Sequence, residues 1–317
     1  MNEAPGTASF FQPRILIPFA LVTLIWGSTW LVIRDQVGSV PPGWSVTWRF
    51  VLAGVAMAAL AAAKRQSLRL TRDALPLIAA MGVFQFSANF QFVYAAEQHL
   101  TSGIVAVLFA FLMVPNAVFA RVFLAQPATR GFVWGSVVAL GGIALLLLHE
   151  YRIAPPEGQV LFGVLLTVGG ILGASIANVL QAGERARRQP MLALLAWSML
   201  FGAAFNAALS WLLYGPPQFE PRWGYAAGIA YLALLGSVVT FPLYFRLIRA
   251  LGPGRAAYNS VLVPIIAMLL STLFEGYRWS VLAVAGVVVA LAGLFIALRA
   301  RGAGAAQPET SARSPSR

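Results

Sequence analysis

The chain alternates between long apolar stretches and short polar joints. A helix needs about 20 mostly apolar residues to cross a hydrocarbon core roughly 30 Å thick. The joints contain Pro-Pro and Gly-Pro pairs and clustered charges, which favour turns. Ten stretches meet the length requirement: Ile15–Ile33, Trp44–Ala63, Ala74–Ala96, Leu100–Ala120, Gly131–Leu148, Gly158–Leu180, Met191–Leu213, Gly224–Phe245, Gly254–Phe274 and Trp279–Leu298. We therefore predict an all-α membrane protein with ten transmembrane helices.

The pattern occurs twice along the chain. One fixed offset without gaps places the hairpin that begins at Leu100 on the hairpin that begins at Leu251, and it places VVALGG at Val137–Gly142 on VVALAG at Val288–Gly293. Five spans in each half turn the second half upside down relative to the first. The sequence thus predicts two inverted five-helix repeats, at residues 15–148 and 158–298. Residues 1–14 form a cytoplasmic N-terminus, and residues 299–317 form a disordered cytoplasmic tail.

Composition and charge agree with a membrane location. Hydrophobic residues make up 59% of the 317 residues and charged residues only 10%, too few to cover a soluble surface of this size. A net charge of +12 suggests nucleic acid in a soluble domain, but with a cytoplasmic N-terminus 17 Lys and Arg fall on the inner side and 4 on the outer. We therefore expect a multi-pass inner (plasma) membrane protein with both termini in the cytoplasm and no nucleic-acid partner.

Neutral polar and aromatic side chains recur inside several spans. Gln85, Ala88, Asn89 and Phe92 share one helix face, and Trp26 and Trp30 share another. Hydrogen bonds between helices, worth about 0.6–2 kcal/mol each, explain such faces as well as a cavity lining does. A cavity of this composition suits an amphiphilic or zwitterionic solute. The candidate substrate-binding residues are Trp26, Trp30, Gln85, Asn89, Phe111, Asn178, Thr240, Tyr244, Tyr258 and Asn259.

Arg49 is the only basic residue well inside a span. It lies near the outer end of the second span, so its side chain can reach the surface or pair with an acid predicted on that side, Asp35, Glu97 or Glu275. We expect a charge pair between Arg49 and Glu275. A structural ion pair is the favoured interpretation, and direct contact with a carboxylate substrate is the alternative.

Two prolines, Pro115 and Pro264, each fall near the middle of a span. Each removes a backbone hydrogen bond and bends its helix. A fixed kink is common in membrane helices. Because the two prolines occupy corresponding spans of the two halves, two residues out of register, we favour a pair of hinges.

The sequence also limits the chemistry. There is no cysteine, the two histidines are separated, and no Asp or Glu lies in the middle of a span. This argues against a catalytic cluster, a metal site and a cation-drug antiporter, and it leaves any ion coupling unexplained. We expect no enzyme activity and no cofactor.

Several motifs together resemble a known family. They are Ile25-Trp26-Gly27-Ser28-Thr29-Trp30, the Arg49-Phe50 pair, Gln98–Gly103 before the fourth span, and Glu275 after the ninth. Over about residues 15–298 the chain is similar to the EamA family of the drug/metabolite transporter superfamily. The resemblance implies ten helices, a central cavity lined mainly by spans one, three, four, six, eight and nine, and export or exchange of small metabolites, often amino acids, by alternating access.

One position departs from the family pattern. The acid common after the fourth span is Gln126 here, whereas its counterpart Glu275 is kept. This weakens a coupling role for the acid in both halves. Family membership does not identify the substrate.

We therefore expect a secondary transporter that exports or exchanges a small amphiphilic metabolite, such as an amino acid or derivative. A lipid-linked or drug flippase of the same superfamily is the alternative, and a membrane-embedded enzyme is less favoured. The expected partners are the small-molecule substrate and the lipid bilayer, with a homodimer left open.

Overall fold

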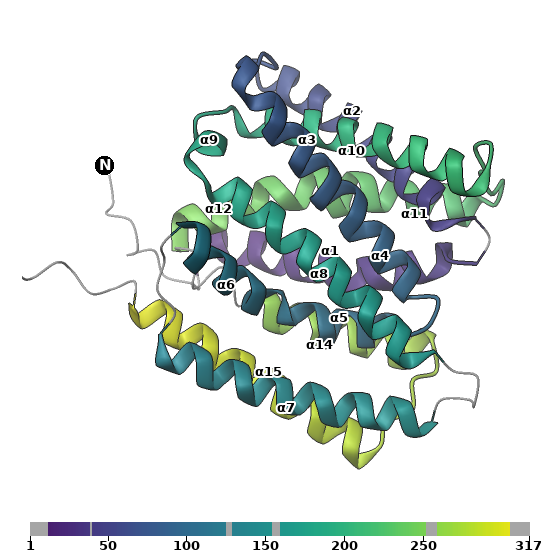
Figure 1. Ribbon diagram of the computed structural model, residues 1–317, viewed down its shortest axis with the longest axis vertical. Helices are drawn as coiled ribbons and strands as arrows, with labels where there is room; N and C mark the ends of the chain where they lie inside the picture. The colour runs from purple at the N-terminus through teal and green to yellow at the C-terminus, as the bar shows by residue number, and fades with distance from the viewer. Residues whose placement is uncertain (1–11, 39, 125–128, 154–158, 252–258, 305–317) are drawn as a thin grey trace, which may run out of the picture.

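The computed structural model describes residues 12–38, 40–124, 129–153, 159–251 and 259–304. Within these ranges every apolar stretch is helical (Figure 1). Eight helical spans are long and apolar enough to cross a membrane, and two shorter apolar helices, Val261–Phe274 and Val281–Ala297, complete the set. This confirms the predicted ten-helix membrane architecture. A lipid core explains it, because a helix satisfies all of its backbone hydrogen bonds internally.

The helices follow the repeat. The first half contains α1 (Pro13–Gln36), α2 (Pro42–Ala63), a third span of η1 (Arg72–Ala74), α3 (Leu75–Val83), η2 (Phe84–Ala88) and α4 (Asn89–Ala96), a fourth span of α5 (Ser102–Phe109), η3 (Ala110–Leu112) and α6 (Met113–Leu124), and α7 (Arg130–Ile153). The second half contains α8 (Val160–Ala182), the short α9 (Glu184–Arg187), α10 (Met191–Tyr214), an eighth span of α11 (Trp223–Ala233), η4 (Leu234–Val239) and α12 (Thr240–Leu251), then α14 (Asn259–Phe274) and α15 (Val281–Gly304).

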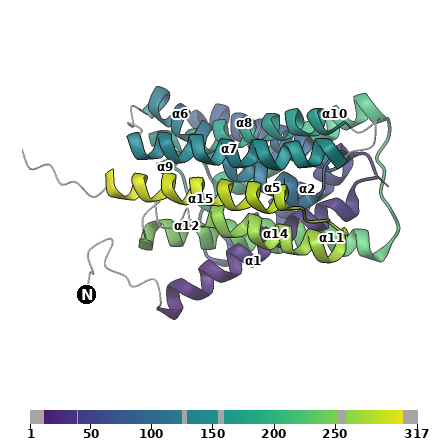
Figure 2. The same cartoon turned by 90° about the horizontal axis from the view of Figure 1, so that it is seen from below.

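The two halves meet in a reciprocal contact between α7 and α15, which run side by side (Figure 1, Figure 2). A Cβ atom on Gly135 would lie 2.6 Å from the carbonyl oxygen of Gly293, and one on Gly142 would lie 2.6 Å from that of Gly286. The repeat places Gly135 on Gly286 and Gly142 on Gly293, so each contact is the image of the other. Such self-complementary pairing is the mark of a local two-fold axis, as expected of inverted repeats.

A second close pair, α2 with α10, lies beside the largest buried apolar cluster. This cluster contains Phe50 of α2, Phe86 and Tyr94 of the third span, Met199 of α10 and Leu232 of α11. Bulky side chains from both halves therefore fill one common core. Because lipid gives little hydrophobic drive for helix association, this shape-matched packing is what holds the helices together.

Each half has a π-helical turn at the same place. The segment Phe84–Ala88 interrupts the third span, and Leu234–Val239 interrupts the eighth at the corresponding position of the repeat. A π turn adds a residue to the helical turn and rotates the side chains beyond it. Beyond the turn, Asn89 is 3% exposed and packs on Gly170 and Gly173 of α8, and Phe92, although 40% exposed, packs on Gly169 of the same helix.

The two prolines have unequal surroundings. Pro115 lies in the first turn of α6, directly after the tight turn η3, a position where a helix does not need the missing N–H. Pro264 lies inside α14, which continues through it. The fourth span thus changes to a 3-10 turn just ahead of its proline, whereas the described part of the ninth span is α-helical from Asn259 through Pro264.

Candidate functional site

Trp26 on α1 joins the eighth span through its indole ring. Its Nε1 donates a hydrogen bond to Thr240 Oγ1 at 2.9 Å, and Thr240 Oγ1 in turn donates to the carbonyl of Gly236 at 2.8 Å. The ring packs against Tyr244 and Phe241 at centroid distances of 5.0 and 6.0 Å. Trp26 and Tyr244 are half-buried, whereas Thr240 is fully buried. The first half thus contributes an indole and the second half a hydroxyl to one amphiphilic surface.

The same face of α1 reaches the ninth span. Thr23 Oγ1 lies 2.5 Å from Asn259 Oδ1. The amide nitrogen of Asn259 is buried without a hydrogen-bond partner in the part of the chain that the structure describes. One turn further along, Ser28 Oγ is 2.6 Å from the hydroxyl of Tyr231 on α11. Polar contacts therefore line α1 on both sides of Trp26.

A second polar group lies where α8 crosses the third and fourth spans. Asn89 packs so closely on α8 that a Cβ atom on Gly173 would lie 3.3 Å from its backbone nitrogen. Its Oδ1 has no hydrogen-bond partner among the described residues, and its Nδ2 is 3.4 Å from the carbonyl of Gln85. Asn178 Nδ2 of α8 lies 3.4 Å from Asn116 Oδ1 of α6. This group repeats, in the other half, the contacts of α1 with the eighth and ninth spans.

A chain of aromatic rings links the eighth span to α2 and the third span. We call it the aromatic row. Its neighbouring centroids lie 6.0, 6.2, 5.2 and 4.9 Å apart along the order Trp26, Phe241, Phe86, Phe50, Phe90. Contacts in this range are favourable edge-to-face or tilted arrangements. The row thus forms a continuous apolar contact between the two halves.

The predicted substrate-binding residues therefore fall into separate sets. Trp26, Thr240 and Tyr244 touch one another, and Asn259 joins them through Thr23. Gln85, Asn89 and Asn178 belong to the second polar group. Trp30 packs on Phe109 instead, at 5.3 Å, and its Nε1 is buried without a hydrogen-bond partner in the described ranges. Tyr258 lies outside the described residues.

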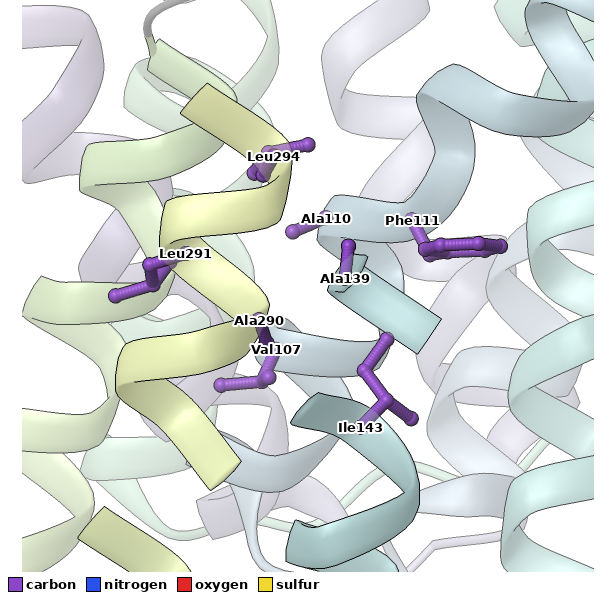
Figure 3. Close-up of a pocket in the computed structure, with 8 residues that line it drawn as sticks. All are labelled: Val107, Ala110, Phe111, Ala139, Ile143, Ala290, Leu291 and Leu294. Atoms are coloured by element: carbon purple, nitrogen blue, oxygen red, sulfur yellow. The ribbon is translucent and has the colours of Figure 1, made fainter. Parts of the chain in front are cut away.

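Phe111 lines a different, apolar pocket. The pocket is a partly open space of about 230 Å³ between the fourth span, α7 and α15. Figure 3 shows that the side chains lining it contain only carbon atoms. Its lining residues are Val107, Ala110, Phe111, Ala139, Ile143, Ala290, Leu291 and Leu294. Because it offers a polar solute no hydrogen bond, it does not extend the site around Trp26.

The predicted pair of Arg49 with Glu275 is not what the structure contains. Glu275 lies 3.6 Å from the Nε atom of Arg34, and it also accepts hydrogen bonds from Ser102. Arg49 is 3% exposed, and its guanidinium carbon stands 4.3 Å from the ring centroid of Phe90. Sequence position alone cannot distinguish two arginines at the same end of neighbouring spans.

The contacts of Glu275 join α1, α5 and α14 at one end of the bundle, which we call the Glu97 end. Arg34 donates to the carbonyl of Glu97, whose side chain is fully buried just beyond the third span. Burial raises the pKa of Glu97 well above its usual value of 4.5, and the neighbouring Glu275 raises it further, against the opposing charges of Arg34 and Arg49. Glu97 and Glu275, from different halves, thus meet around one arginine.

Sequence reasoning missed Thr23 and Asn116 as partners in the site. Thr23 lies three residues before Trp26, on the same helix face, and Asn116 directly follows Pro115. Helical spacing could have found the first. The partner of Asn178 depends on how the fourth span bends, which no residue spacing reveals.

A family model for EamA-like transporters matches residues 14–148 and, a second time, residues 161–299. The chain belongs to this family. As an EamA-family protein it is a membrane transporter, and its family implies a small-molecule substrate and a lipid bilayer environment.

Two of three similar curated proteins are named as transporters. The inner membrane transporter YedA of Escherichia coli K12 is 32% identical over 263 residues, which cover 80% of each chain. PagO of Salmonella typhimurium is 23% identical over 90% of this chain and 93% of its own. The S-adenosylmethionine/S-adenosylhomocysteine transporter of Chlamydia trachomatis serovar L2 is 22% identical over 84% of each chain.

A solved crystal structure has the same fold. It superimposes with a TM-score of 0.67 at 18% sequence identity, covering 90% of this chain and 97% of the other.

Proposed function

We propose that this EamA-family transporter is a secondary transporter that exports or exchanges a small amphiphilic metabolite, an amino acid or a derivative of one, by alternating access. The observation that carries the proposal is the contact of Trp26 with Thr240 and Tyr244. It places aromatic surface and neutral hydrogen-bonding groups from both halves in one place, where relative movement of the halves changes the site.

The contacts at the Glu97 end support alternating access. Arg34, Ser102 and Glu275 tie α1, α5 and α14 together there. Opening this end requires these contacts to break while the opposite end closes. Pro115 and Pro264 remain our proposed hinges, and residues 15–148 and 158–298 the proposed moving repeats.

We further propose that the Glu97 end faces outward and that both termini are cytoplasmic. The excess of Lys and Arg at the other ends of the spans supports this orientation. The inner membrane location named for YedA supports the same membrane for this chain.

A ligand screen tests the proposal. Purified full-length protein is heated with amino acids, amines, sugars, nucleosides, cationic drugs and S-adenosylmethionine, and each solute that raises the unfolding midpoint is then tested for uptake and counterflow in proteoliposomes. We expect an amino acid or a derivative to stabilise the protein and to exchange across the membrane. Stabilisation and transport by none of them would refute the proposed substrate class.

The matched variants are Trp26→Phe, which removes the indole donor from the site, and Trp197→Phe. Trp197 Nε1 donates to the carbonyl of Leu68, far from Trp26 in the chain, and its side chain is exposed. We expect only the first to weaken the effect of the solute.

A further inference from the structure

Arg49 is a buried charge with unused hydrogen-bond donors. Its side chain is 3% exposed, and neither Nε nor Nη1 has a hydrogen-bond partner among the residues that the structure describes. The rings of Phe50 and Phe90 cover it, with centroids 5.1 and 4.3 Å from the guanidinium carbon. Cation–π contact satisfies part of the charge, but it gives the in-plane N–H groups no acceptor. An isolated buried guanidinium is costly unless something completes it.

The surroundings of Arg49 connect it to the candidate site. A Cβ atom on Gly236 would lie 3.8 Å from Arg49 Nη2, so the guanidinium lies against the backbone of the π-helical turn η4. The carbonyl of Gly236 also accepts from Thr240, and it lies 3.4 Å from Trp26 Nε1. One glycine thus separates Arg49 from the indole of Trp26. Arg49 also ends the aromatic row, beside Phe90.

Glu97 is the matching unused acid. It is 0% exposed, and neither oxygen of its carboxyl group has a hydrogen-bond partner in the described part of the chain. Arg49 and Glu97 interact electrostatically, and the hydroxyl of Tyr94, one turn before Glu97, interacts with Arg49 and donates to Gln36 at 3.0 Å. No salt bridge joins Arg49 to Glu97 among the described residues, so both side chains keep hydrogen-bonding atoms without partners.

The other charged groups nearby already have partners. Arg34 is held by Glu275 and by the carbonyl of Glu97, and Asp35 forms an ion pair with Arg222 at 2.9 Å. Glu275 is also occupied by Ser102. This leaves Arg49 and Glu97 as the buried groups at this end that form no salt bridge among the described residues.

We propose that Arg49 and Glu97 form a head-group site for a zwitterion. The carboxylate of the solute accepts the free N–H groups of Arg49, and its ammonium donates to the oxygens of Glu97. A zwitterion adds no net charge, so it completes both groups without leaving a new charge in low dielectric. The apolar part of the solute then extends past Gly236 toward the half-buried rings of Trp26 and Phe241. This inference rests on the proposed transport function and specifies its substrate class.

Four related probes test the carboxylate and the ammonium of the head group separately. L-Leucine carries both charges, L-leucinamide and 3-methylbutylamine lack the carboxylate, and 4-methylpentanoate lacks the amine. Binding to the purified full-length wild-type protein is measured by calorimetry. We expect each single-charge analogue to bind about tenfold or more weakly than leucine, the loss typical of one charge-assisted hydrogen-bonded group. This series needs no substitution and therefore no variant that folds.

Two substitutions then test which residue binds each charged group of leucine. In Arg49→Gln, leucine should bind as weakly as leucinamide, and in Glu97→Gln, it should bind as weakly as 4-methylpentanoate. Arg49→Lys keeps the charge without the planar fork and should fall between. The matched controls are Arg222→Gln, whose arginine pairs with Asp35 at 2.9 Å, and Glu150→Gln, whose buried acid is held by the Tyr277 hydroxyl at 3.0 Å. Both should discriminate among the four probes as the wild type does.

Three results overturn the assignment. One is equal binding of leucine and its analogues by the wild type. Another is unchanged discrimination in Arg49→Gln or Glu97→Gln. The third is a double variant that is more stable than either single variant and binds leucine like the wild type, because Arg49 and Glu97 would then interact only with each other.

If an uncharged solute from the screen is transported while leucine does not bind, the head-group site is wrong but the proposed transport function stands. If nothing is bound or transported, the proposed function itself fails.

Discussion

Glu275 caps a helix that belongs to the other half of the protein. One of its carboxylate oxygens lies 3.2 Å from the backbone nitrogen of Ser102, at the start of α5, and the other lies 2.5 Å from Ser102 Oγ. A carboxylate at a helix N-terminus is stabilised by the free N–H groups and the helix dipole. Arg34 from α1 completes the contact. One side chain therefore joins α1, α5 and α14 at the Glu97 end.

Loss of this cap should open the Glu97 end. We expect Glu275→Ala to lower the free energy of unfolding by about 1–2 kcal/mol, the usual cost of a lost cap with a charge-assisted bond. It should also speed the reaction of a membrane-impermeant maleimide with Ser271→Cys, because Ser271 is fully buried nearby on α14. The natural chain has no cysteine, so the label reports on this position alone. Equal labelling rates with and without Glu275 would contradict the prediction.

The contact between α7 and α15 makes two adjacent glycines behave differently. A Cβ atom on Gly142 would collide with the main chain of α15, whereas one on Gly141 would meet nothing within 4 Å. Gly142→Ala should therefore force the helices apart and lower the unfolding midpoint. Gly141→Ala should be neutral or stabilising by about 0.5–1 kcal/mol through its better helix propensity. Thermal unfolding in the same detergent compares the two, and similar midpoints would show that the close contact is not formed.

The hydrogen bond between Trp26 and Thr240 should contribute to solute binding through the position of the indole ring. Thr240→Val removes the acceptor at nearly constant volume and leaves the indole N–H with the more distant carbonyl of Gly236, at 3.4 Å. A buried donor without a good acceptor costs about 1–3 kcal/mol. We expect a loss of stability of this order and weaker binding of the solute found in the ligand screen. Thr272→Val, which removes a hydroxyl that the indole of Trp279 contacts at 2.8 Å, is the control. Equal effects of both variants on binding would argue against a site at Trp26.

Glu97 should make stability depend on pH. Its pKa in the folded protein is raised well above 4.5, first by burial and then by Glu275, while Arg34 and Arg49 oppose the shift. The folded state therefore holds this proton more tightly than the unfolded state. The resulting stability is fully present below about pH 4.5 and is lost as the pH rises through the folded pKa. Glu97→Gln removes this loss, so its advantage over the wild type should grow with pH. Unfolding midpoints measured from pH 4.5 to pH 9 test this, and a constant difference would refute it.

The sequence predicts the spans well because lipid leaves the backbone few choices. A stretch such as Met191–Leu213 must be helical to satisfy its N–H and C=O groups, and α10 covers it. The glycines that recur in the sequence likewise form the close contact between α7 and α15 in the structure. Hydrophobic pattern and internal repetition are thus sufficient for the architecture.

The details of the site depend on local geometry that composition does not encode. The π-helical turns Phe84–Ala88 and Leu234–Val239 rotate the side chains beyond them without any change in hydropathy. Depth in the membrane cannot assign a partner to Glu275, because Arg34 and Arg49 both lie near the same end of the bundle in sequence terms. Residue type is enough to make Trp26, Thr240 and Tyr244 candidates, but their mutual contact follows only from the packing of α1 on the eighth span.

The fourth span contains a 3-10 turn where the corresponding residues of α14 are α-helical. The turn Ala110–Leu112 corresponds in the repeat to residues 261–263 at the start of α14. In inverted repeats, the opposite conformation of the protein is obtained by letting each half adopt the shape of the other. For the alternating access proposed above, we therefore expect a second state in which the fourth span is α-helical through Ala110–Leu112 and α14 has a 3-10 turn just ahead of Pro264. The difference between the fourth span and α14 in this conformation thus predicts their difference in the opposite conformation.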